Sequence, residues 1–387
     1  MEKTQRTLRK EDSTELGILY MAFELSQSTW KLAFSNGKKI RTVTIDGRDL
    51  DQLQKAIDDS KSRFTMIGEV RMCSCYEAGR DGFWLHRYLL SSGIDNVVVD
   101  SSSIEVDRRK RRAKTDRIDA RRLLHMLMRY HAGERLLWRV VNVPSVEQED
   151  RRQLHWELDM LKKERTIHRN RIKALLIQQG IALNNPSSKK FLGDLEVWRT
   201  WDGKALPSDL KARLVREYER LRMVEEQIYG LKKQRQRRLE NAESPSVEKV
   251  VQLMTLRGIA VNSSWKFVNE FFAWRQFHNR RELGALAGLT PTPYDSGGSQ
   301  REQGISKAGN SRIRTLAVEM AWVWLRLQPQ SKLSQWYAER FGSGGKRMRR
   351  IGIVAVARRL LIDLWRYLEY GLIPEGAVLR TEMIRFY

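Results

Sequence analysis

The chain has 387 residues, of which 41% are hydrophobic and 9% aromatic, and its formal net charge is +24. This length and hydrophobic content suffice for two or three folded domains, which excludes a disordered tail. The charge indicates a polyanionic partner, most simply DNA or RNA, and no apolar run is long enough to cross a membrane. The first residues lack the pattern of a signal peptide, and Cys73 and Cys75 are too close together for an ordinary disulfide. We therefore expect a cytoplasmic protein that binds nucleic acid.

Residues 1–143 are predicted to form a mixed α/β sheet flanked by helices. A strand buried on both faces is predicted from Gly17 to Glu24. Further strands are expected at 30–34, 39–45, 67–76 and 96–100, with helices at 49–63, from Gly79 to Ser92, and around 116–119. The resulting order, three strands and then alternating helices and strands, is typical of a mixed sheet.

Four carboxylates in this region form a candidate metal site. Glu24 and Glu77 each end a predicted strand, where open α/β sheets bind their ligands. Asp116 and Asp119 are three residues apart and share one helix face, in a segment (105–122) that carries nine Lys or Arg. If the two strands are neighbours, the four acids converge and can bind one or two Mg²⁺ ions for chemistry at a phosphodiester. The alternative is ordinary: solvated strand ends and an acidic pair in salt bridges.

Residues 144–244 are predicted to form two long helices, 146–179 and 208–239, joined by a polar link. Apolar residues recur in both at coiled-coil spacing, among them Leu154, Leu158, Leu161, Leu214, Leu221 and Ile228. Such helices can fold back as an antiparallel hairpin or join those of a partner. The basic run 232–238 is either a solvated face or a surface that follows nucleic acid.

Residues 245–387 are predicted to be mostly helical and to contain a second catalytic candidate. A turn at Gly258 between two helices resembles a helix-hairpin-helix element that binds phosphate, although a plain turn has the same pattern. A small-residue helix at 282–287 leads into a predicted loop, 289–299, rich in Pro, Ser and Gly. Ser296 in this loop, next to glycines and near several cations, is suited to attack a phosphorus atom.

Three other side chains near Ser296 are alternatives for the nucleophile. Ser299 and Ser306 are further serines, and Ser306 fits a helix cap better. Tyr294 has the phenol that tyrosine recombinases use, but no His/Arg constellation accompanies it in the sequence. Cations beside these motifs are the predicted nucleic-acid-binding residues: Arg108, Arg109, Arg111, Arg112, Lys114, Arg301, Lys307, Arg312, Lys346 and Arg347.

Two sets of motifs, in the right order, resemble one known family. The first set is the strand ending in Glu24, Tyr-Glu-Ala-Gly at 76–79 and Lys-Thr-Asp-Arg-Ile-Asp-Ala at 114–120; the second is Ala-Gly-Leu-Thr-Pro at 287–291, the Ser296-Gly297 pair and Ile-Ser-Lys-Ala-Gly-Asn at 305–310. The chain resembles the DEDD insertion-sequence transposases (the insertion-sequence one-ten/eleven-eleven family), which are related to Piv-type DNA invertases. The resemblance implies a RuvC-like domain of ribonuclease-H-like fold at 1–143, a coiled-coil linker at 144–244 and a transposase domain at 245–387.

The resemblance also implies a mechanism. Glu24, Glu77, Asp116 and Asp119 would hold Mg²⁺, and Ser296 would form a 5′-phosphoserine with DNA, so that the two parts make a composite site. Glu24 departs from the family, whose usual acid there is Asp. The implied partners are donor and target double-stranded DNA, a bridge RNA that guides both, and further copies of the chain, as a dimer assembling to a tetramer in the bacterial nucleoid.

Two other functions remain open on the sequence. One is a RuvC-like nuclease or junction resolvase that uses metal-activated water, with Ser296 in a structural turn. The other is a non-catalytic RNA-binding or architectural protein whose acids are salt-bridged. A covalent adduct between protein and DNA would separate the first from the transposase, and dependence on Mg²⁺ would exclude the second.

Overall fold

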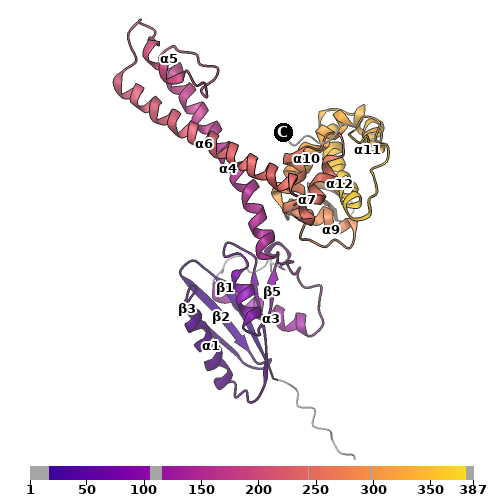
Figure 1. Ribbon diagram of the computed structural model, residues 1–387. Helices are drawn as coiled ribbons and strands as arrows, with labels where there is room; N and C mark the ends of the chain where they lie inside the picture. Colours follow the sequence, from indigo (N-terminus) through magenta and orange to yellow (C-terminus); the bar gives the residue numbers. More distant parts are fainter. Residues whose placement is uncertain (1–16, 105–115, 243, 297–298, 381–387) are drawn as a thin grey trace, which may run out of the picture. The chain divides into compact units, whose positions relative to one another are not determined.

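The computed structural model describes residues 17–104, 116–242, 244–296 and 299–380 (Figure 1). For residues 102, 116–118, 293–296 and 299–303 it describes the backbone alone. The chain divides into two compact units, Met1–Val143 and Pro144–Tyr387, and each is described by itself. No helix in the described ranges has an apolar run long enough to cross a membrane.

The first unit is built on a five-stranded mixed sheet with the strand order β3-β2-β1-β4-β5. The three antiparallel strands are β1 (Gly17–Leu25), β2 (Thr29–Ser35) and β3 (Ile40–Asp46). The strands β4 (Val70–Glu77) and β5 (Asp95–Val99) extend the sheet parallel to β1. This arrangement confirms the predicted mixed sheet and its element order.

Helices cover both faces of the sheet. Helices α1 (Leu50–Arg63) and α2 (Trp84–Ser91) pack on one face, and α3 (Asp116–His131) packs on the other. Because both faces are covered, the central strand β1 can be apolar at nearly every position, which is why its sequence shows no alternation. The helix predicted to start at Gly79 starts only at Trp84, because the intervening residues form a turn that the Tyr76 hydroxyl holds by donating to the Gly82 carbonyl (3.1 Å).

The second unit begins with an antiparallel pair of long helices, α4 (Val146–Ile177) and α6 (Ser208–Glu240) (Figure 1). Leu158 packs with Val224 and Ile228, and Ile172 packs with Leu214 nearer to the connection between the two helices. A short helix, α5 (Phe191–Val197), lies in the connection between the two long helices. Of the two predicted arrangements, the chain therefore adopts the fold-back hairpin.

The rest of the second unit is a helical domain around one apolar core. Its helices are α7 (Pro245–Met254), α8 (Val261–Phe267), α9 (Arg280–Leu286), α10 (Ser311–Leu327), α11 (Lys332–Tyr337) and α12 (Lys346–Tyr370), with π-helical turns η3 (Val268–Phe272) and η4 (Ala338–Gly342). Leu154 of α4 and Leu239 of α6 join this core. The long helices are therefore packed into the helical domain.

The segment predicted as a loop at 289–299 is instead part of a β-hairpin. Strand β6 (Pro291–Ser296) pairs antiparallel with β7 (Ser299–Ile305), with an irregularity between Pro291 and Pro293. Proline argues against a central strand because it lacks an N–H, but both strands of an isolated ribbon are edge strands and tolerate it. The loop prediction was wrong because it gave the prolines too much weight.

Candidate functional site

The carboxylate edge is the end of the sheet where Glu24, Glu77 and Asp119 lie. The parallel register pairs Phe23 with Tyr76, so Glu24 and Glu77 follow side by side on β1 and β4. Because side chains alternate along a strand, they share a face with Ala22 and Cys75, two residues earlier. That is the face covered by α3. Both acids also line a cavity of about 300 Å³ at the strand ends.

The direction of α3 brings its first turn to the same edge. The ring of His131, the last residue of α3, contacts the ring of Tyr20 near the start of β1 (5.9 Å), and the Cys75 thiol lies 3.8 Å from the Leu123 carbonyl. Helix α3 therefore runs antiparallel to β1 and β4. Asp119 lies about 6 Å along the helix axis before Leu123, and Glu77 about 7 Å along the strand after Cys75. Asp119 and Glu77 are thus at the same level.

Metal binding at this edge remains a prediction. Among the described side chains, no three His, Cys, Asp or Glu lie close enough together to hold a metal ion. The side chain of Asp116, the first residue of α3, lies outside the described set. In chemistry the donors fit Mg²⁺, which prefers carboxylate oxygens. Cys75 does not compete, because burial and the nearby Glu77 charge raise the pKa of its thiol and keep it protonated.

Ser296 lies at the tip of the β6–β7 hairpin. It is the last residue of β6 and pairs with Ser299, while Tyr294 pairs with Arg301. Their side chains, and residues 297–298, lie outside what the structure describes. The hairpin thus gathers the predicted nucleophile and two of its alternatives in one element without choosing between them.

Ser306, the third alternative, follows the hairpin and does not cap a helix. Its backbone N–H donates to the Thr290 carbonyl (2.9 Å). Asn310 caps α10 instead, its side chain accepting from the N–H groups of Arg312 and Ile313. The prediction of Ser306 as a cap was therefore wrong, because the residue that caps the helix is Asn310, four positions later.

Two glycines, Gly288 and Gly309, make close backbone contacts at the base of the hairpin, and we call these contacts the glycine lock. Gly288 has φ +68°, and a Cβ there would lie 2.0 Å from the Ala308 carbonyl oxygen. Gly309 has φ +88°, and its Cβ would lie 2.2 Å from the Leu286 carbonyl oxygen. The Asn310 N–H also donates to Leu286 O (2.7 Å). The segments 287–291 and 305–310, which carry the resemblance, are therefore packed backbone against backbone, and only glycine fits both contacts.

Two predicted cations lie beside this lock. Lys307 has φ +56° and is exposed, and its carbonyl accepts a hydrogen bond from the Arg314 guanidinium (2.9 Å). The Arg312 guanidinium lies 3.4 Å from Glu270 Oε1 and 4.5 Å from the centre of the Trp156 ring. Arg312 is therefore held in place, with 57% of its side chain still exposed.

Glu270 is a residue that the sequence analysis missed. Its carboxylate is buried and accepts hydrogen bonds from His155 Nε2 (2.9 Å) and the Trp156 indole. Burial raises the pKa of Glu270, but the hydrogen bonds from His155 and Trp156, with the charges of His155 and Arg312, outweigh it and bring the pKa to about 2. The available signal was a single charged residue in the apolar run 267–274.

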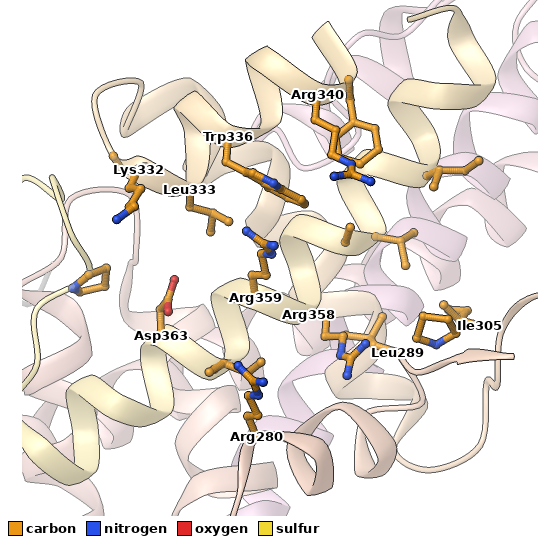
Figure 2. Close-up of a pocket in the computed structure, with 18 of the residues that line it drawn as sticks. Arg280, Leu289, Ile305, Lys332, Leu333, Trp336, Arg340, Arg358, Arg359 and Asp363 are labelled. Atoms are coloured by element: carbon orange, nitrogen blue, oxygen red, sulfur yellow. The ribbon is translucent and has the colours of Figure 1, made fainter. Parts of the chain in front are cut away.

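A large basic groove, with a volume of about 1880 Å³, runs between α9, α11, α12 and the base of the hairpin (Figure 2). Ten cations line it: Arg280, Arg281, Lys332, Arg340, Lys346, Arg347, Arg350, Arg358, Arg359 and Arg366. Asp363 and Glu375 are the acids of this lining. Lys346 and Arg347 were predicted to bind nucleic acid, and Arg350 belongs to the same basic run, 346–350, whereas the other seven cations were missed.

The remaining predicted cations cannot be placed. Arg108, Arg109, Arg111, Arg112 and Lys114 lie outside the described residues, as does the side chain of Arg301. The predicted nucleic-acid surface of the first unit therefore stays a prediction.

Comparison with known proteins identifies the class and then the family. Residues 251–335, which include the glycine lock and the hairpin, match the model of the Transposase IS116/IS110/IS902 family. A Sinorhizobium fredii protein named "Putative transposase y4rJ" is 38% identical over 380 residues, 95% of this chain and 96% of its own. The transposase for insertion sequence element IS1111A of Coxiella burnetii is 27% identical over 267 residues, 67% of this chain and 66% of its own. The class is thus insertion-sequence transposase.

The similarity to the Sinorhizobium protein extends over nearly the whole of both chains. The chain therefore belongs to the IS116/IS110/IS902 family of transposases.

Proposed function

We propose that this transposase cuts and rejoins DNA through a 5′-phosphoserine at Ser296, with Mg²⁺ held by Glu24, Glu77, Asp116 and Asp119. The observation that carries the metal half is the parallel register of β1 and β4. It sets Glu24 beside Glu77 on the face covered by α3, whose first turn lies at the same end. A mixed sheet of this order with acids at its strand ends supports a RuvC-like domain.

The serine half of the proposal rests on the second unit. The Ser296 oxygen would attack a backbone phosphorus, forming a bond from serine to phosphorus while the bond from phosphorus to the 3′ oxygen breaks. The serine loses its proton, and the departing 3′ oxygen gains one to become a hydroxyl. Rejoining is the reverse, because a 3′-hydroxyl attacks the phosphoserine and releases the serine. One phosphodiester is exchanged for another, so no external energy source is needed.

The carboxylates have a different task. Mg²⁺ bound by them would polarise a phosphoryl oxygen and neutralise the negative charge that develops there. Glu24 and Glu77 extend from buried, hydrogen-bonded strands, so their backbones are fixed relative to each other. The first unit therefore supplies rigid oxygen donors, and the second supplies the covalent nucleophile.

The proposed partners are donor and target double-stranded DNA, a bridge RNA and further copies of the chain, in the bacterial cytoplasm. The net charge of +24 and the ten cations of the basic groove support nucleic-acid binding. The long α4–α6 hairpin offers a surface for pairing, since Met160, Ile167 and Met223 on it are more than half exposed.

A suicide DNA substrate, nicked so that the reaction stops after cleavage, tests the proposal. The wild-type protein is expected to form a covalent adduct that denaturing electrophoresis detects, and Ser296→Ala to form none. Ser299→Ala is the matched control, since it removes a hydroxyl from the facing position of the same hairpin. A free 5′-phosphate product without any adduct would instead establish the nuclease alternative, which the carboxylate edge alone favours.

A further inference from the structure

One face of α12 alternates arginine and apolar side chains along the basic groove. The residues recur every three or four positions, as expected for one helix face: Arg347, Ile351, Val354, Arg358, Ile362 and Arg366. From Arg347 to Arg366 the helix rises about 29 Å. The groove is therefore a long track and not a closed pocket for a small molecule.

The apolar side chains among the lining arginines, here called the apolar floor, are partly exposed. Ile351 is 42% exposed and Leu372 59% exposed, although both are large apolar residues. On the facing wall Trp336 has the Arg359 guanidinium 3.6 Å from its ring centre (Figure 2). Apolar and aromatic surface between rims of charge is suited to bases that have left a double helix. A duplex keeps its base faces stacked and presents mainly phosphates, so such a floor would gain little from it.

The charge of the groove is available to a ligand. Lys332 is paired with Glu375 (2.7 Å). None of the other nine groove cations forms a salt bridge with an acid in the described part of the chain. The charge of Asp363 acts on Arg359 and Arg366, but the lining still has ten cations against two acids. A surface with such an excess of positive charge is stabilised when a polyanion binds.

We propose that the basic groove binds a single strand of DNA, with its phosphates at the arginine rims and its bases against the apolar floor. The length of the track accommodates roughly four or more nucleotides. The choice of DNA rests on the proposed function, in which strands are cut and exchanged. Leu289, Pro291 and Ile305 at the base of the Ser296 hairpin line the same groove, so the bound strand adjoins the element that carries the nucleophile.

Fluorescence anisotropy with labelled oligodeoxythymidine of about twelve nucleotides tests this inference. The full chain carries Ser296→Ala, so binding is measured without covalent reaction. Adding Arg350→Gln and Arg358→Gln should weaken binding about 30-fold. The negative slope of log K against log salt should become shallower by about 1.4, because each lost phosphate contact contributes about 0.7. The matched control, Arg213→Gln with Arg216→Gln, removes two exposed cations of α6 and should change binding less than about twofold.

Variants of the apolar lining decide between a single strand and other occupants. Ile351→Ser with Leu372→Ser should weaken binding of the single strand and leave binding of a blunt duplex of equal length within about threefold of the parent, because a duplex does not use these apolar side chains. Equal losses for duplex and single strand would overturn the inference. So would tighter binding of oligouridylate, since the occupant would then be RNA.

Photocrosslinking gives a readout that does not depend on variants folding. Oligodeoxythymidine carrying bromodeoxyuridine should crosslink to the peptide that contains Trp336, and excess unlabelled single strand should compete it away. Crosslinks confined to other peptides would contradict the inference. The adduct assay separates this result from the proposed function: a missing adduct refutes the serine and leaves groove binding standing, whereas a normal adduct with no groove binding refutes the groove.

Discussion

The carboxylate edge and the basic groove are built in opposite ways. Glu24 and Glu77 lie at the carboxyl ends of two largely buried strands whose register sets their spacing. The groove cations stand on α9, α11, η4 and α12, most of them are exposed, and long flexible stems carry their charges. A metal-ion site needs ligands on fixed backbones, whereas a polymer of variable sequence is better held by many adaptable charges.

The largest expected effect is on catalysis at the carboxylate edge. Glu77→Gln keeps the size of the side chain and removes its charge, so strand cleavage should fall about a thousandfold, roughly 4 kcal/mol of barrier. The midpoint of thermal unfolding should change little, because the position lines a cavity and not the core. Arg80→Gln, in the lining of the same cavity, is the control and should retain cleavage within about tenfold. Equal losses of cleavage in both variants would show that the Glu77 carboxylate has no special role.

Substitutions in the glycine lock of the second unit should affect the free energy of unfolding more than the cleavage activity. Gly288→Ala forces a Cβ against the Ala308 carbonyl and should cost about 4 kcal/mol in the free energy of unfolding. Gly304→Ala is matched, because Gly304 also has positive φ (+88°) but has no atom within 4 Å of its added Cβ. It should cost only about 1 kcal/mol. Denaturant unfolding measures the loss of stability in both variants. Similar losses would mean that the positive φ of the glycine, and not the close contact at Gly288, determines the cost.

Glu270 tests whether α4 and α10 are coupled through a buried charge. Glu270→Ala should destabilise the second unit by about 3 kcal/mol, because it leaves the polar hydrogens of His155 and Trp156 buried without their acceptor. The pKa of Glu270, lowered from 4.5 to about 2, adds a pH dependence. The fold favours the ionised form, so this stabilisation is complete above about pH 4.5 and is lost as the pH falls toward 2. Unfolding measured from pH 6 to pH 3 should show that loss in the wild type and not in Glu270→Ala.

The smallest effect concerns the acid inside the basic groove. Burial raises the pKa of Asp363 from 3.8 to about 6, although Arg366 and Arg359 act to lower it. The fold therefore favours the protonated form, and stability falls as the pH rises from about 4 to about 6. Asp363→Asn should add about 1 kcal/mol of stability at pH 8 and almost none at pH 4. It should also tighten single-strand binding a few-fold at pH 8; unchanged binding there would place the strand away from Asp363.

The sequence predicted the carboxylate edge better than the groove for a physical reason. A strand buried on both faces is a continuous apolar run, so its end, and an acid such as Glu24 or Glu77, can be located from the sequence. The register that makes them neighbours pairs residues 53 positions apart, such as Phe23 with Tyr76, and comes from the structure alone.

The groove could not be located in this way. On α12, Ile351, Val354, Leu361 and Leu364 recur at helical spacing, but Leu361 and Leu364 are buried while Ile351 and Val354 line the groove. Apolar periodicity does not distinguish a core face from a binding face. The glycine lock is a second example, because the close contacts of Gly288 with Ala308 and of Gly309 with Leu286 exist only in the folded chain.

The proposed mechanism divides the chemistry between metal-binding carboxylates and a covalent serine. Mass spectrometry of the proteolysed protein–DNA adduct tests this division by locating the residue that carries the nucleotide. We expect a 5′-linked nucleotide on Ser296, in an amount that falls steeply when Mg²⁺ is chelated. A nucleotide on Tyr294 would contradict this mechanism. So would an adduct that forms equally well when divalent metal is absent or when Glu77 is replaced by Gln.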